Sequence, residues 1–238
     1  MPWIRGFDGI STYLNLNTAA LYPDVVAILR QEIEDLVAEC VAYIQIDAPR
    51  YTYFVDERWR QRIRDQGEDP EAIIDEWIEA DNSSLSKLDL KETILAMHLC
   101  RGNNRGGWFG EGGHGPIAEK IFNAIDVDRF LLEFDSDRYG GFEPLQHIPK
   151  HKTVVLGLIT TKTAPPENLV DLLRRVDEAA RFFPMENLQS APNAASRHSS
   201  KATLCLGISN AESWNWWRRR RGRRGGRLSC QRHAQYYN

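Results

Sequence analysis

The segment TILAMHLCRG, residues 93–102, decides the fold prediction. An apolar run of this length that stops at a glycine is typical of a buried strand, and alternate residues of a strand point to one side. His98 and Cys100 are two residues apart, so the sequence predicts an imidazole and a thiol on one face at the end of a strand. Such a pair supplies half of a tetrahedral zinc site, although buried histidines and cysteines also serve simply as core residues.

Strand and helix patterns alternate on both sides of this segment. Near-continuous apolar strands separated by helices indicate parallel strands in an α/β fold. Four strands are clear, so the pattern alone leaves open a (β/α)8 barrel, which needs eight strands, and an open doubly wound sheet. The expected strands are 41–47, 93–99, 129–134 and 153–159. The expected helical stretches are 23–40, 57–90 with breaks at Gly67 and Asp69–Pro70, 116–125 and 166–182.

Both folds place functional groups at the carboxyl ends of their strands. Asp47 and Glu133 end two of the expected strands, as the imidazole and thiol end a third. Each carboxylate has a simpler alternative: Asp47 could cap the following turn, and Glu133 could pair with Arg129 or Arg138. His114, in the glycine-rich stretch 102–115, is interpreted as a loop residue, with a proton carrier as the alternative.

Composition narrows the functional class. The 238 residues carry a net charge of −3, and no apolar run approaches the roughly 20 residues of a membrane span. The N-terminus lacks the apolar core of a signal peptide, so we expect a cytoplasmic protein. The glycine-rich stretch lacks the Gly-Lys-Ser/Thr ending of a phosphate loop, which argues against nucleotide binding.

Three segments together resemble a known family: MHLCRGNNRGGWFGEGGHGPIAEKIFN (97–123), DVDRFLLEFDSDRYGGFEPL (126–145) and PKHKTVVLGLITTKT (149–163). They are similar to the C-terminal catalytic zinc domain of cobalamin-independent methionine synthase, in its short, single-domain-like relatives. The resemblance runs from about Leu21 to Leu188. It implies a TIM (β/α)8 barrel, here incomplete at both ends, with residues 1–189 as a partial catalytic domain.

The resemblance also implies chemistry. Family members use zinc to transfer a methyl group from a methylated folate to the thiol of homocysteine, forming methionine. Carried over, His98, Cys100 and Glu133 are metal ligands, and Asp47 holds the amino group of the substrate. Binding to zinc strips the proton from a thiol, whose free pKa is about 8.5, and so makes a nucleophile at neutral pH. The long enzymes place a proton-transferring histidine where this chain has residues 159–162, Ile-Thr-Thr-Lys, so no catalytic acid or base is assigned.

Residues 190–238 do not match the family. From residue 187 onward the chain holds ten of its 30 Lys and Arg but only one carboxylate, Glu212. Translated in a neighbouring frame, residues 191–203 can spell PQCGF and its continuation, the family motif that carries the fourth zinc ligand. We therefore expect a frame-shifted, disordered tail; an unstructured basic tail and a nucleic-acid arm of tryptophans and arginines are the alternatives.

The functional prediction is thus a methyltransferase resembling the 5-methyltetrahydropteroyltriglutamate–homocysteine S-methyltransferases, with zinc as cofactor. Its partners are a small-molecule thiol and a methyl donor, with folate as the expected donor, and neither a membrane nor a nucleic acid. Three alternatives stay open: a zinc alkyltransferase for coenzyme M or another small thiol, a non-catalytic remnant, and a protein that binds through its basic tail. Salt-sensitive binding of nucleic acid that depends on the tail would favour the last.

Overall fold

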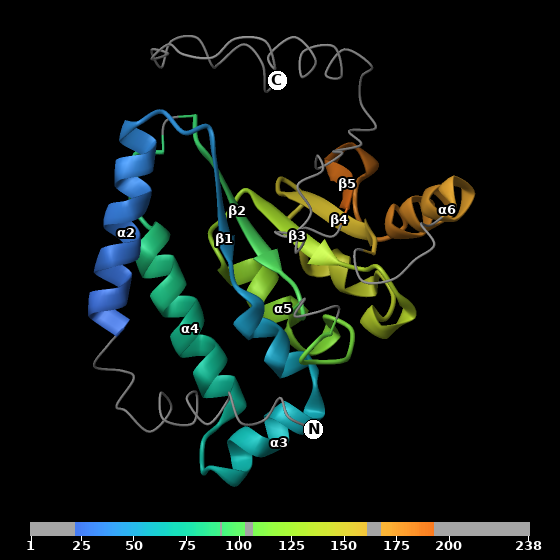
Figure 1. The fold of residues 1–238 in the computed structure, drawn as a ribbon, viewed down its shortest axis with the longest axis horizontal. Coiled ribbons are helices and arrows are strands. Elements are labelled where there is room, and N and C mark those ends of the chain that lie inside the picture. The colour runs from blue at the N-terminus through green and yellow to red at the C-terminus, as the bar shows by residue number, and fades with distance from the viewer. Residues whose placement is uncertain (1–21, 91, 103–106, 161–167, 193–238) are drawn as a thin grey trace.

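The computed structural model describes residues 22–90, 92–102, 107–160 and 168–192. Within these ranges one parallel sheet follows the order of the sequence, with β1 and β5 at its edges (Figure 1). The strands are β1 (Tyr43–Asp47), β2 (Ile94–Leu99), β3 (Arg129–Glu133), β4 (Thr153–Ile159) and β5 (Leu188–Pro192). A doubly wound sheet reverses its strand order at a switch point, whereas a barrel segment keeps sequence order. The α/β prediction is confirmed, and closure into a barrel stays a prediction.

The connections between strands are helical. Helices α3 (Glu57–Asp65) and α4 (Pro70–Leu85) join β1 to β2, and α5 (Gly115–Ala124) joins β2 to β3. Along the chain, helix α6 (Leu169–Ala179) connects β4 to β5. Helix α2 (Tyr22–Ala38) precedes β1 and packs along α4 (Figure 1). Short 3-10 helices complete the connections: η3 (Pro49–Val55), η4 (Asp137–Tyr139), η5 (Glu143–His147) and η6 (Met185–Asn187).

The helical stretch expected over 57–90 consists of two helices, α3 and α4, and they are separated at the expected breaks, Gly67 and Asp69–Pro70. Gly67 adopts a φ of +85°, a left-handed conformation that ends α3 and that glycine reaches without steric cost. The Asp69 side chain then accepts a hydrogen bond from the Glu71 amide at 3.0 Å, and Pro70 occupies the first turn of α4. This is the usual chemistry of a helix start, and it turns the chain sharply between α3 and α4.

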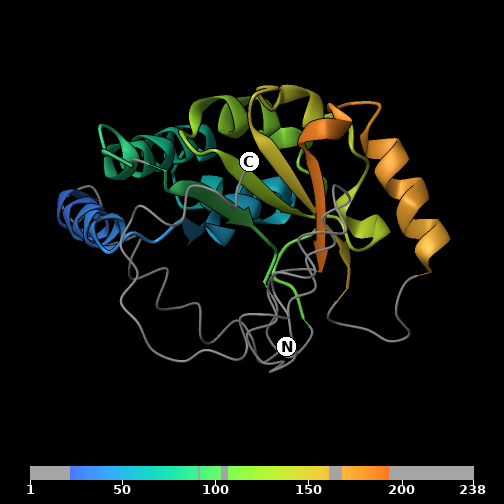
Figure 2. The ribbon, with the colours of Figure 1, turned by 90° about the horizontal axis from the view of Figure 1, so that it is seen from above.

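The main core lies between one face of the sheet and the helices, on the side where Figure 2 shows α4 and α5. Met97 of β2 and Phe130 of β3 point to this face, and the Phe130 ring lies 5.1 Å from that of Phe122 on α5. Burial of each such side chain stabilises the fold by about 1.5–3 kcal/mol. Since alternate residues point the other way, Ala96, Leu131 and Val155 form a small separate cluster on the opposite face.

The structure adds β5, which the sequence analysis did not predict. Its residues Leu188–Pro192 pair with β4, and they cross the boundary expected between residues 189 and 190. The predictions for the rest of the tail concern residues 193–238, which lie outside the described ranges. No helix in the described part of the chain is both long enough and apolar enough to cross a membrane.

Candidate functional site

The strand register brings the predicted site residues to one end and one face of the sheet. Asp47 is the register partner of His98, and His98 is the partner of Leu131. His98 lies two residues after Ala96, and Glu133 lies two residues after Leu131, so both side chains share the face of the small Ala96–Leu131–Val155 cluster. This face is the one that points inward in a barrel.

Cys100 follows β2 directly, one step beyond the register pair Leu99 and Leu132, and so comes level with Glu133. The contact of the next residue agrees, because the Arg101 amide donates to Glu133 Oε2 at 2.8 Å. Cys100 is buried, and its backbone carbonyl accepts a hydrogen bond from the hydroxyl of Thr52 on η3 at 2.8 Å. Residues from β1, β2 and β3 therefore meet at this end of the sheet.

Asp47 contacts His98 in this structure. The Nδ1 of His98 and the Oδ1 of Asp47 are 2.8 Å apart, with the histidine almost fully buried and the carboxylate about half exposed. An ionised carboxylate accepts, so the Nδ1–H group of His98 donates this bond, and Nε2 is the ring nitrogen that points away from Asp47. This is the arrangement typical of a histidine that binds a metal through Nε2. The N-cap residue of η3 is Ala48, and that helix start has no side-chain capping bond.

Glu133 is fully buried at the end of β3. Its Oε2 accepts from the Arg101 amide. Burial chiefly, and then the charges of Glu133 and Asp135, raise the pKa of Tyr139. The two arginines considered as partners in the sequence lie over other rings, Arg129 over Tyr43 and Arg138 over Trp108.

Two further residues lie near this carboxylate and were missed by sequence reasoning: Arg101 and Tyr139. Arg101 is fully buried, its Nη2 donates to the Gly112 carbonyl at 2.5 Å, and its guanidinium carbon lies 4.5 Å from the centroid of the Tyr139 ring. Burial lowers the pKa of Arg101 to about 10, against the opposing charge of Glu133. Arg101 directly follows β2 in the sequence. Because arginine is rarely buried, its position did not predict that its side chain would be buried near Glu133.

His114 lies in the loop directly before α5, as interpreted from the sequence, and it is fully buried, with its ring 5.3 Å from that of Phe134. Burial, and then the charge of Arg101, lower its pKa well below the ordinary value. Within the part of the chain that the structure describes, neither ring nitrogen has a hydrogen-bond partner, and the same holds for Nε and Nη1 of Arg101. A neutral His114 is thus a core residue beside a buried cation.

The donor atoms of His98, Cys100 and Glu133 are of the types that zinc binds. Nitrogen, sulfur and carboxylate oxygen are its usual donors, and His98, Cys100 and Glu133 supply one of each from neighbouring strand ends. These three side chains do not converge on one point, however: among the residues that the structure describes, no group of three or more His, Cys, Asp or Glu side chains is arranged to hold a metal ion. Glu133 instead bonds Arg101, so ligation by all three residues remains a prediction.

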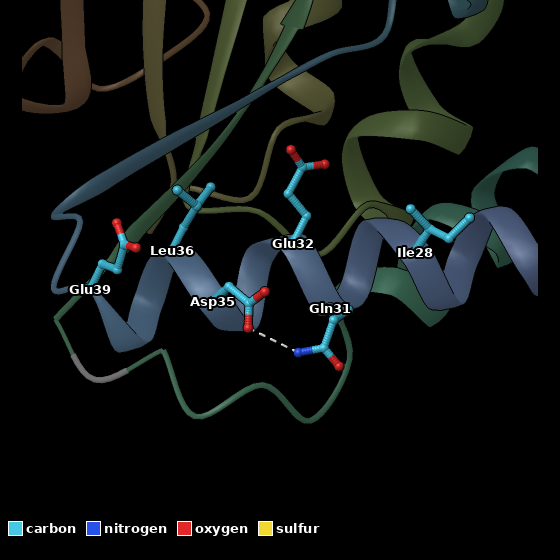
Figure 3. A pocket seen from close by; sticks show the side chains of 6 residues that line it. All are labelled: Ile28, Gln31, Glu32, Asp35, Leu36 and Glu39. Atoms are coloured by element: carbon cyan, nitrogen blue, oxygen red, sulfur yellow. Dashed lines mark hydrogen bonds between the residues drawn. The ribbon is translucent and has the colours of Figure 1, made fainter.

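A hollow of about 530 Å³ lies elsewhere, along α2 (Figure 3). Five of its six lining residues lie on that helix and Glu39 directly follows it: Ile28, Gln31, Glu32, Asp35, Leu36 and Glu39. Gln31 donates to Asp35 at 3.0 Å, and none of the predicted site residues lines the hollow. It is a shallow feature of a helix surface and is distinct from the candidate site.

Comparison with known proteins supports the resemblance in part. No family model matches the sequence. Two uncharacterized proteins of Bacillus subtilis are similar: YxjH is 32% identical over 173 residues, which is 72% of this chain and 45% of YxjH, and YxjG is 31% identical over 184 residues, 76% of this chain and 48% of YxjG. The chain therefore spans about half the length of these relatives.

Two solved structures share the fold. One is a Listeria monocytogenes protein assigned as a vitamin B12-independent methionine synthase, with a TM-score of 0.59 and 25% identity over 76% of this chain and 50% of that one. The other is a B12-independent methionine synthase from Shewanella sp. W3-18-1 in complex with selenomethionine, with a TM-score of 0.52 and 21% identity over 71% and 46%. The chain thus has the fold of part of these proteins.

Proposed function

We propose that this chain is a zinc-dependent methyltransferase of the methionine synthase type, which transfers a methyl group from methyltetrahydrofolate to the thiol of homocysteine. One observation carries the proposal: the register puts His98, Cys100 and Glu133 at neighbouring strand ends, toward one face of the sheet. The likeness to the Listeria protein supports it at the level of the family.

His98, Cys100 and Glu133 would hold the zinc ion, with His98 offering Nε2 because Asp47 holds its Nδ1. When bound, zinc supplies acidity that keeps the acceptor thiol ionised at neutral pH. The new bond joins the acceptor sulfur to the methyl carbon, the bond from that carbon to the donor nitrogen breaks, and the nitrogen takes up a proton. Asp47 ends β1 beside His98, where a carboxylate can also bind the ammonium group of an amino-acid thiol. Action in the cytoplasm is part of this proposal.

The test is methyl transfer by the full chain after loading with zinc. Methionine formation from homocysteine and methyltetrahydrofolate is followed by mass spectrometry, with coenzyme M and mercaptoethanol as acceptors in parallel. We expect methylation of homocysteine, its loss in Cys100→Ser, and its retention in His151→Ala, which changes an exposed histidine of a turn. Methylation of coenzyme M alone would replace the acceptor in this proposal, and no methylation of any thiol would refute the proposal.

A further inference from the structure

Trp108 is an exposed aromatic residue on a loop whose backbone is anchored. It lies between β2 and α5 and is 44% exposed. The next residue, Phe109, packs inward, with its ring 4.4 Å from that of Tyr53 on η3. The Phe109 amide donates to the Arg101 carbonyl at 2.9 Å, and the Phe109 carbonyl accepts from the Trp59 indole at 2.8 Å. Since Phe109 is held by these contacts, the backbone of Trp108 is fixed beside the end of β2.

A guanidinium covers one face of the Trp108 ring. Arg138 belongs to η4, which follows β3, and its guanidinium carbon lies 3.3 Å from the centroid of the indole. Its Nε lies 3.5 Å from Oε1 of Glu111, so the cation is itself restrained over the ring. The contact joins the connections that follow β2 and β3, at the carboxyl ends of the strands, where α/β folds bind their ligands.

This arrangement selects one kind of ligand. The exposed part of Trp108 is a flat, apolar surface, which suits another planar ring in an offset stack. A cation is attracted to the face of an indole, but here the charge of Arg138 already occupies one face and would repel a second cation across the ring. The surface therefore favours a planar ring without positive charge. An aromatic side chain that is already held in place also loses little conformational freedom when a ligand binds.

We propose that Trp108, backed by Arg138, is the surface on which the planar heterocycle of the methyl donor stacks. The inference rests on the proposed function, because methyltetrahydrofolate carries an uncharged bicyclic heterocycle, and it adds a binding residue outside the predicted site. Truncation of an aromatic side chain on which a heterocyclic base stacks costs about 5–150-fold in affinity.

The test compares Trp108→Leu, Trp108→Phe and the control Tyr43→Leu in the full chain without added zinc. Tyr43 is a matched control because it is 37% exposed and has the guanidinium of Arg129 over its ring at 5.9 Å, yet it begins β1, at the opposite end of the sheet. Binding is measured by isothermal titration calorimetry with methyltetrahydrofolate. A second titration uses 4-aminobenzoylglutamate, which keeps the carboxylates and lacks the bicyclic ring.

We expect Trp108→Leu to weaken binding of methyltetrahydrofolate by about 5–150-fold, with a smaller loss in Trp108→Phe, which keeps a ring, and none in Tyr43→Leu. Binding of 4-aminobenzoylglutamate should not depend on Trp108. Wild-type binding that Trp108→Leu and Tyr43→Leu leave equally strong, or weaken equally, would refute the stacking surface while the proposed function stands. A wild-type chain that binds no methyltetrahydrofolate would refute both the stacking surface and folate as the donor. Binding that depends on Trp108 in a chain that methylates no thiol would support the stacking surface and refute only the proposed function.

Discussion

Replacing Glu133 by glutamine removes a charge from a fully buried position and keeps nearly the same shape. Arg101 is buried near it, and among the described residues its guanidinium nitrogens Nε and Nη1 have no hydrogen-bond partner. In Glu133→Gln this cation loses the carboxylate that most opposes the lowering of its pKa. Opposite charges that lie further apart than a direct ion pair interact by less than about 4 kcal/mol inside a protein. We expect a loss of about 2 kcal/mol, because the charge of Asp135 and the hydrogen bond to the Gly112 carbonyl still act on Arg101.

The assay is urea denaturation of the metal-free full chain at neutral pH. The matched control is Glu119→Gln on α5, which changes an exposed carboxylate and should stay within about 0.5 kcal/mol of the wild type. A double-mutant cycle with Arg101→Met isolates the coupling: once the cation is absent, the charge of Glu133 should contribute far less. A loss below about 1 kcal/mol in Glu133→Gln, or strict additivity in the double variant, would refute the electrostatic dependence of Arg101 on Glu133.

Three further predictions follow from single contacts. Asp47→Asn should lower zinc affinity about 10–100-fold, whichever thiol is present, because Oδ1 holds His98 Nδ1; a raised KM for homocysteine alone would leave Asp47 only its substrate role. Asp56→Ala should cost about 1–2 kcal/mol in denaturation, since Asp56 caps α3. Although burial opposes it, hydrogen bonding by Arg58 holds the pKa of Asp56 below 3.8, so this difference should persist at neutral pH and shrink as pH falls below that value; a constant difference would contradict the assignment. Gly112→Ala should destabilise by about 1–3 kcal/mol, because φ is +127° and the added Cβ would lie 2.6 Å from a carbonyl oxygen of η3, whereas Gly115→Ala, with nothing within 4 Å, should be nearly neutral.

The sequence predicted most of the fold from apolar runs. The strands β1 to β4 are near-continuous apolar segments, and burial on both faces of a sheet demands such a pattern. β5 was not predicted because Leu188–Pro192, LQSAP, has few apolar side chains and ends in proline. Its pairing with β4 depends on the neighbouring strand rather than on its own composition.

The candidate site likewise contains residues that the sequence predicted and residues that it did not. The placement of His98 and Glu133 on one face followed from strand alternation, and the register agrees. The burial of Arg101, His114 and Tyr139 could not be predicted, because it results from contacts between distant segments. A buried arginine is stable only where other groups, such as a carboxylate or a carbonyl, compensate its charge. These groups come from distant segments, so a local sequence pattern does not predict them.

The central claim is that His98, Cys100 and Glu133 bind one metal ion, and zinc content tests it most directly. The full chain is purified with zinc, dialysed, and measured by elemental analysis and zinc X-ray absorption, together with Cys100→Ser and the control His151→Ala. The account predicts about one zinc ion per chain with a sulfur neighbour at about 2.3 Å in the wild type and the control, and loss of both in Cys100→Ser. A wild-type chain without zinc, or a Cys100→Ser variant that keeps zinc and the sulfur neighbour, would contradict it.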